Sequence, residues 1–110
     1  KSHLGEDDSI IINDGKKNHI LSLDKILMLQ ADHVYTRFIM IDNNEYLCRN
    51  PLHHFQNKLP NTDFIKCHRS YVVNLRYIKN WNSFELTMTN GAKVPISKSH
   101  RDLVYQMLNK

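Results

Sequence analysis

The stretch FIKCHRSYVVNLRYIKNW, from Phe64 to Trp81, holds the side chains of this sequence that are best suited to chemistry. A cysteine and a histidine are adjacent within it, at Cys67 and His68. Four cationic side chains also lie there with no carboxylate among them, namely Lys66, Arg69, Arg76 and Lys79. These residue types are compatible with three kinds of chemistry: nucleophilic catalysis, metal binding and the binding of a polyanion.

Catalysis by a cysteine requires a histidine within hydrogen-bonding reach of the thiol. Cys67 and His68 lie in a segment that is predicted to be extended, so their side chains should point to opposite faces. The alternation of Cys67 with Ile65 and Val73 predicts instead that the thiol is buried. The sequence has no glycine-rich phosphate loop, no nucleophile elbow and no paired carboxylates. We therefore expect neither enzymatic activity nor a cofactor, and a catalytic Cys-His protein is the most distant alternative.

The residues that could bind a metal do not have the spacing of a metal site. Structural zinc sites favour pairs such as Cys-x2–4-Cys with a matching second pair, and this sequence has no such pair. His53 and His54 are adjacent in a predicted helix, so we expect them to be half-exposed surface residues. We therefore expect no metal site among the candidate ligands, which are Cys48, His53, His54, Cys67 and His68.

The composition predicts one small globular domain. Of the 110 residues, 41% are hydrophobic and 24% are charged. No apolar run approaches the ~20 residues that cross a bilayer, so we expect no membrane contact. Two cysteines are too few for a disulfide scaffold, which favours the reducing cytoplasm. The polar opening predicts a linker or frayed terminus at residues 1–8 and a folded domain at residues 9–110.

The net charge of +4 is unevenly distributed along the chain. Residues 1–54 carry six lysines and arginines against eight carboxylates, a balance of −2, and residues 55–110 carry nine against three, a balance of +6. Such a bias is compatible with a polyanionic partner. The competing interpretation is a solvated basic face that binds nothing negative, and composition does not decide between the two.

The elements that must position these residues follow a period of two, which is typical of antiparallel strands. Asn13-Asp14-Gly15 and Asn90-Gly91 are strong tight-turn signals. Between them, alternating segments predict hairpins in series. Pro95 predicts an edge or bulged strand. The predicted strands are SIIIND, KNHILSL, DKILMLQA, HVYTRFIMI, EYLCR, the opening stretch as far as Val73, and the two arms of FELTMTNGAKVPI, in which Phe84, Leu86 and Met88 alternate.

Two helices interrupt this pattern. In the first, Asn50 is a candidate N-cap, Pro51 suits the first helical position and Pro60 ends the helix. The second closes the chain, where Ser97 or Ser99 could cap a helix. Their apolar stripes are Leu52, Phe55 and Leu59 in the first, and Leu103, Val104, Met107 and Leu108 in the second. The sequence therefore predicts a mainly β fold with a short central helix and a C-terminal helix.

The opening stretch closely resembles the signature of the LytTR DNA-binding domain family, in which an aromatic residue and a cation precede His-Arg-Ser-[Tyr/Phe]-[Leu/Val]-Val-Asn. The matching positions are Phe64, Lys66, His68, Arg69, Ser70, Tyr71, Val72, Val73, Asn74 and Ile78. The final hairpin, LTMTNGAKVPISKSHRDLVYQML, is similar to the family's last hairpin with its [Leu/Val]-Pro-[Val/Ile]-Ser-[Arg/Lys] ending. The resemblance extends over residues 9–108.

This resemblance implies an elongated antiparallel β fold that inserts loops, not a recognition helix, into successive grooves of double-stranded DNA. It also implies a bacterial transcriptional regulator of the two-component type. The N-terminal partner would be a receiver domain, and the domain would pair on direct repeats in promoters. The alternative from another class is a small β-rich protein-interaction module with an incidentally basic face.

The resemblance places DNA contacts in three segments. The segment Asp32–Arg37 would enter a major groove, where either His33 or Tyr35 lies near the bases. His68–Ser70 would lie across the minor groove with Arg69 pointing at DNA, although a purely structural role for His68 is an equal alternative. Ser97–Arg101 would enter the next major groove, with Lys98 as the main reader where many members have arginine. The expected contact residues are His33, Tyr35, Arg37, His68, Arg69, Ser70, Ser97, Lys98, Ser99 and Arg101.

Overall fold

The computed structural model describes residues 8–109, which form a mainly β fold with two helices, as predicted. The linker predicted at residues 1–8 lies outside the described residues except for Asp8. The helices are α1 (Leu52–Gln56) and α2 (Arg101–Leu108). The strands are β1 (Ser9–Asn13), β2 (Asn18–Ser22), β3 (Ile26–Asp32), β4 (Tyr35–Met40), β5 (Glu45–Cys48), β6 (Phe64–His68), β7 (Tyr71–Asn74), β8 (Ile78–Trp81), β9 (Glu85–Met88) and β10 (Lys93–Pro95).

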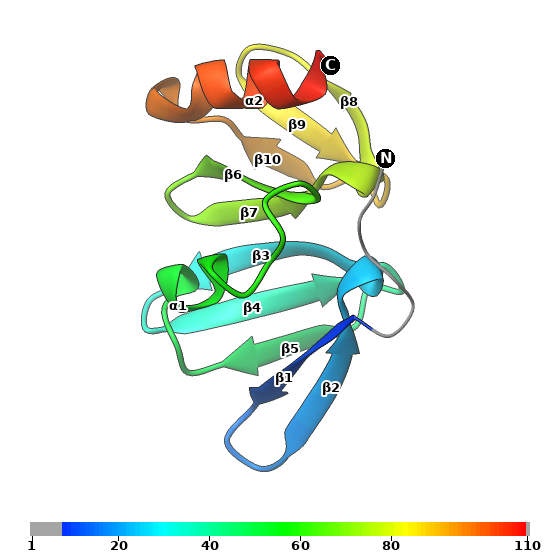
Figure 1. Cartoon of the computed structure of the whole chain (residues 1–110), viewed down its shortest axis with the longest axis vertical. Helices are drawn as coiled ribbons and strands as arrows, with labels where there is room; N and C mark the ends of the chain where they lie inside the picture. The colour runs from blue at the N-terminus through cyan, green and yellow to red at the C-terminus, as the bar shows by residue number, and fades with distance from the viewer. Residues whose placement is uncertain (1–7, 110) are drawn as a thin grey trace.

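The strands form three antiparallel sheets arranged along the long axis of the molecule (Figure 1). A five-stranded sheet, in the order β5-β4-β3-β7-β6, occupies the middle. The β1–β2 hairpin lies at one end and the three-stranded sheet β10-β9-β8, with α2, at the other. The predicted edge position of Pro95 is confirmed, because β10 is an outer strand. The principal extents are 39 × 31 × 25 Å.

Strands β3, β6 and β7 of the central sheet are buried on both faces, because their successive residues belong to two different hydrophobic cores. Phe64 and Val72 lie in a core with β1, β2 and α1, whereas Ile65 and Val73 lie in a core with β9, β10 and α2. A strand buried on both faces is a continuous apolar run, which explains the sequence of β3. A register shift between Ile26 and Met28 adds one irregularity to that strand.

Helix α1 is shorter than predicted, and its predicted cap is wrong. Pro51, with φ −70° and ψ 160°, is the N-cap and supplies no side-chain hydrogen bond. The Asn50 side chain instead accepts from the Cys48 thiol at 3.3 Å. The helix is held by burial of Leu52 and Phe55 in the first core.

The C-terminal region also differs from the prediction in two details. Neither Ser97 nor Ser99 caps α2, which starts at Arg101 after a short 3-10 turn, η3 (Lys98–His100). Phe84 is 71% exposed and does not join the alternation of β9. The physical reason is a turn in which the Asn82 side chain accepts from the main-chain N–H groups of Phe84 and Glu85, at 2.8 and 3.0 Å.

Asn74 joins the central sheet to the segment that follows it. Its side chain donates to the Ile26 carbonyl oxygen at 2.9 Å and accepts from the Arg76 N–H at 3.0 Å, with only 1% of the residue exposed. We expect Asn74→Ala to lower the free energy of unfolding by about 1–3 kcal/mol, because a buried carbonyl loses its donor. Urea unfolding measures this, with the exposed Asn80→Ala as control. Equal stability of the two variants would contradict the assigned role.

Candidate nucleic-acid interface

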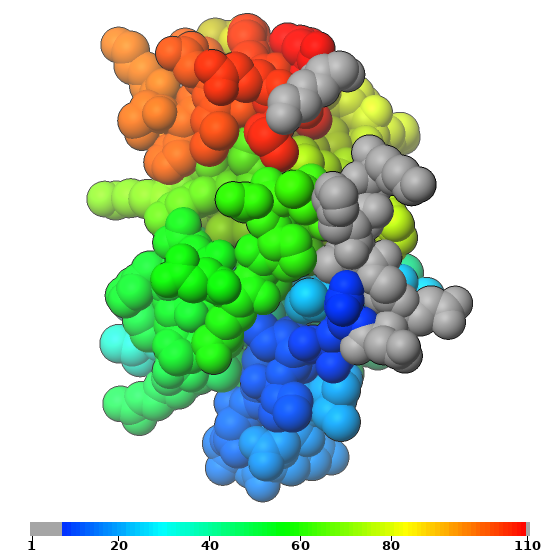
Figure 2. Space-filling view, in the orientation of Figure 1, coloured from blue at the N-terminus to red at the C-terminus, as the bar shows by residue number. Residues whose placement is uncertain are grey.

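Three candidate loops lie at one edge of the molecule because of strand direction. Both β3 and β6 pair antiparallel with β7, so they run in the same direction and their following turns emerge at the same end of the sheet. The segment after β10 reaches that end too, and the three segments are seen at the left in Figure 1. The cyan, yellow-green and orange surfaces at the left of Figure 2 are the corresponding parts of the chain.

Main-chain hydrogen bonds fix the spacing of these loops. The Ala31 N–H donates to the Ser70 carbonyl oxygen at 2.8 Å, which joins the end of β3 to the β6–β7 turn. The Ser97 N–H donates to the Cys67 carbonyl oxygen at 3.0 Å, which joins the segment after β10 to β6. The three segments that hold the ten expected contact residues are therefore tied to one another through the sheet.

The β3–β4 loop has a strained, exposed tip and an ion-paired base. His33 has a φ of 59° and a side chain that is 92% exposed, and its Nδ1 donates to Asp32 at 3.1 Å. Arg37 donates to Asp32 at 2.8 Å and to Glu45 at 2.9 Å. The hydrogen bonds from His33, first, and Arg37 lower the pKa of the Asp32 carboxyl. The ion pairs of Arg37 thus orient the loop. The half-buried Tyr35 follows the tip.

The β6–β7 turn presents one free cation. Arg69 is exposed at the turn and makes no ion pair with any residue between 8 and 109. The Ser70 N–H donates to His68 Nδ1 at 3.1 Å, and the His68 ring packs on Tyr71 with 5.6 Å between centroids. This geometry gives His68 a structural role. In the neutral ring it leaves Nε2 as the protonated nitrogen.

The segment after β10 presents a second free cation, Lys98. Lys98 is exposed and forms no ion pair within the described part of the chain. The Ser97 and Ser99 hydroxyls lie 2.5 and 3.2 Å from His100 Nδ1, so their hydrogen bonds stabilise the turn in which they lie. Burial, followed by the nearby charges of Lys66 and His68, lowers the pKa of His100. Sequence reasoning missed His100, although its Ser-x-x-His spacing was a readable signal.

Arg101 lies at the start of α2 and is only partly available. Its guanidinium carbon lies 5.5 Å from the centroid of the exposed Phe84 ring, a cation–π distance. Its Nε is buried without a hydrogen-bond partner in the part of the chain that the structure describes. Of the four predicted cations, Arg37 is ion-paired and Arg101 is half-buried, whereas Arg69 and Lys98 are exposed and form no ion pair within residues 8–109.

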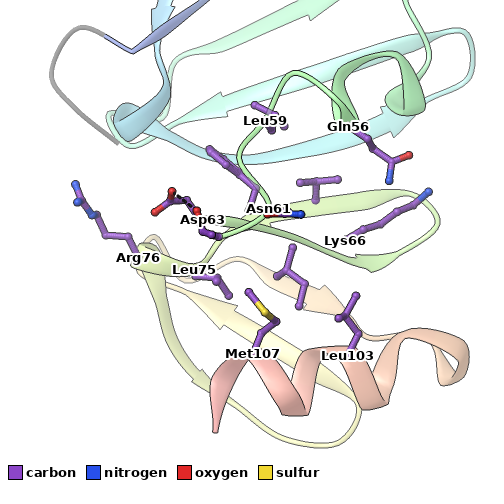
Figure 3. Close-up of a pocket in the computed structure, with 13 residues that line it drawn as sticks. Gln56, Leu59, Asn61, Asp63, Lys66, Leu75, Arg76, Leu103 and Met107 are labelled. Carbon is purple, nitrogen blue, oxygen red and sulfur yellow. Dashed lines mark hydrogen bonds between the residues drawn. The ribbon is translucent and has the colours of Figure 1, made fainter. Parts of the chain in front are cut away.

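The candidate interface is a row of projecting loops and is separate from the main groove. That groove, about 970 Å³ in volume, lies between α2, β6 and the segment before β6 (Figure 3). Its lining includes Leu59, Leu103 and Met107, with Lys66 and Arg76 toward opposite ends in Figure 3. None of the ten predicted contact residues lines it.

The structure brings no metal ligands together. Among residues 8–109, no group of three or more histidine, cysteine or acidic side chains is arranged to hold a metal ion. In the same range, no helix has the length and apolar character needed to span a membrane.

The sequence of the chain matches a known protein family over most of its length. Residues 16–109 match the family model for the LytTr DNA-binding domain, the family named above LytTR. The chain is a member of the LytTr family. A solved LytTr DNA-binding domain from Bacillus cereus superimposes with a TM-score of 0.79 at 26% identity, and the match covers 93% of this chain and 97% of the other. The predicted fold of LytTr type is thereby confirmed.

Curated relatives of this LytTr chain are longer proteins. The sensory transduction protein LytT of Enterococcus faecalis is 39% identical over 70% of this chain, which covers 37% of that protein. LytT of Bacillus subtilis is 28% identical over 98% of this chain and 46% of that protein. The transcriptional regulatory protein LytR of Staphylococcus aureus is 30% identical over 84% of this chain and 39% of that protein. The LytTr chain therefore spans less than half the length of these relatives.

Cys67 is predicted to be chemically inert. It is fully buried in the second core, and burial raises its pKa to about 12. At about pH 8 roughly one thiol in ten thousand would be ionised, so a thiol alkylator should modify Cys67 at least about a hundredfold more slowly in the folded than in the urea-unfolded chain. Cys48→Ser isolates the measurement on Cys67, since Cys48 is the second cysteine. Rapid alkylation of the folded variant would instead support the hypothesis that Cys67 is a catalytic nucleophile.

Proposed function

We propose that this LytTr domain binds double-stranded DNA through its three tied loops, as the output domain of a bacterial transcriptional regulator. The observation that carries the proposal is the pair of free, exposed cations, Arg69 and Lys98, on one hydrogen-bonded edge. Lysine and arginine side chains neutralise phosphates, and the release of counterions supplies affinity without regard to sequence. Membership of the LytTr family supports the same assignment.

The shape of the domain fits a reader that uses loops. Its long axis of 39 Å is comparable to one turn of B-DNA, about 34–36 Å. In the proposed arrangement, the β3–β4 loop enters a major groove, Arg69 crosses the intervening minor groove and Lys98 enters the next major groove. His33 and Tyr35 remain joint candidates for base contact in the first loop. Contact along one face also favours bending at flexible steps, which would be read indirectly.

The context of the domain is part of the proposal. Its relatives are named as sensory transduction and transcriptional regulatory proteins, and the chain spans less than half of each. We propose an N-terminal receiver domain in the full-length protein, a folded DNA-binding unit at residues 9–110 and pairing of two domains on direct repeats. The buried free thiols, Cys48 and Cys67, suit the reducing cytoplasm.

We expect Arg69→Ala and Lys98→Ala to weaken DNA binding. Each variant should reduce the slope of log affinity against log salt by about 1, and loss of a base contact should cost about 1–3 kcal/mol. Duplexes selected from a random pool and fluorescence anisotropy at several salt concentrations provide the measurement. Lys79→Ala is the charge-matched control, because Lys79 is exposed on β8, away from the loops.

Two outcomes would contradict this assignment in different ways. Wild-type affinity in both variants, with an intact fold, would show that the contact residues are wrong. A wild-type chain that selects no duplex and gives no mobility shift at low salt would favour the protein-interaction alternative.

Lys98→Arg should sharpen base selection. Arginine offers a planar fork to guanine O6 and N7, whereas lysine acts as a flexible point charge. We expect the selected sites of Lys98→Arg to show a stronger guanine preference at one position, with a salt slope unchanged from wild type. A selection profile identical to that of wild type would mean that Lys98 contacts phosphate and not a base.

A further inference from the structure

The segment that follows β5 lies beside the first DNA-facing loop. Because β4 and β5 are antiparallel, β5 ends where β4 begins, and the last paired residues are Thr36 and Cys48. Arg49 follows Cys48 directly and Tyr35 precedes Thr36, so the two residues flank the end of this ladder. Figure 1 shows the connection from β5 to α1 passing next to the β3–β4 loop at the left edge.

Side-chain hydrogen bonds hold this segment in place. The Thr36 hydroxyl donates to the Asn50 carbonyl oxygen at 2.8 Å, and Thr36 is fully buried. The Cys48 thiol donates to the Asn50 side-chain oxygen at 3.3 Å. Arg49 is therefore carried by a backbone that is anchored on both sides.

The charge of Arg49 is free, in contrast to that of its neighbour Arg37. Arg37 is paired with Asp32 and Glu45, whereas Arg49 is exposed and forms no ion pair within the described residues. Residues 46–62 contain no carboxylate, so the β5–α1 connection and α1 supply no nearby counter-charge. The only exposed ionisable groups that α1 adds are the imidazoles of His53 and His54.

We propose that Arg49 contacts DNA outside the three loops and so forms a fourth contact site. It binds the phosphate backbone flanking the groove entered by the β3–β4 loop. The strand order β5-β4-β3-β7-β6 puts Arg49 on the outer side of that loop, away from Arg69. The contact lengthens the footprint at one end and adds affinity without base selection. This inference rests on the proposed DNA-binding function.

The test compares Arg49→Ala with wild type on a selected duplex that is shortened stepwise from each end. Arg49→Ala should lower the slope of log affinity against log salt by about 0.9, the value for one phosphate contact on B-DNA. Shortening from one end should cause the same loss in wild type and no further loss in Arg49→Ala. Arg49→Lys should keep the wild-type slope, since it keeps the charge.

Arg76→Ala is the matched control, because Arg76 is also an exposed arginine and lies in the turn η2 (Leu75–Tyr77), away from the loop edge. An unchanged slope in Arg49→Ala, while Arg69→Ala loses affinity, would overturn the fourth contact and leave the proposed function standing. Equal losses in Arg49→Ala and Arg76→Ala would also overturn it, because the effect would then be one of net charge. Absence of duplex binding by wild type would overturn both.

Discussion

The two main-chain hydrogen bonds between loops are the constraint on which the candidate interface depends. Ala31 to Ser70 and Ser97 to Cys67 join three turns that are separated by dozens of residues in sequence. Without them each loop would keep its own freedom, and the entropy of ordering all three would oppose binding. With them, the spacing between Arg69 and Lys98 is a property of the folded sheet.

These bonds are held in place because the strands behind them, β3, β6 and β7, are buried on both faces. β3 pairs with both β4 and β7, and its central residues Leu27 and Leu29 are fully buried, one in each core. Buried main-chain groups must find partners, so the strands hold a single register. That register in turn determines which loop residues meet at the edge. A change of one residue in pairing would send the apolar side chains of a strand to the wrong faces, so the core and the interface are specified together.

The sequence was informative wherever the signal was local or carried by a long motif. Turn dipeptides and alternation predicted the other hairpins, but the stretch predicted as one strand as far as Val73 is two antiparallel strands, β6 and β7, joined by a turn at Arg69 and Ser70. Cys67 alternated as a core residue, and the stretch around His68 identified the family. The sequence was misleading where a polar side chain had a choice of hydrogen-bond partners. Asn50 was predicted to cap α1 but bonds to the Cys48 thiol, and Ser97 was a candidate cap of α2 but bonds to His100. The pairing of Arg37 and the position of Arg49 could not be predicted, since they depend on the β3–β4 and β4–β5 registers.

The contrast between Arg37 and Arg49 shows why residue type alone does not identify a contact. Asp32 places a carboxylate in a loop that is proposed to approach phosphates, and its lowered pKa keeps it ionised. An unpaired anion there would repel DNA, but Arg37 and His33 both bind it, which offsets part of its charge. In the proposed complex, Arg37 therefore offsets a carboxylate that would otherwise repel DNA, although its own charge is already ion-paired. The cations proposed to contact DNA are those that form no ion pair within residues 8–109, and the pairing of strands, not distance along the chain, decides which cations meet a carboxylate.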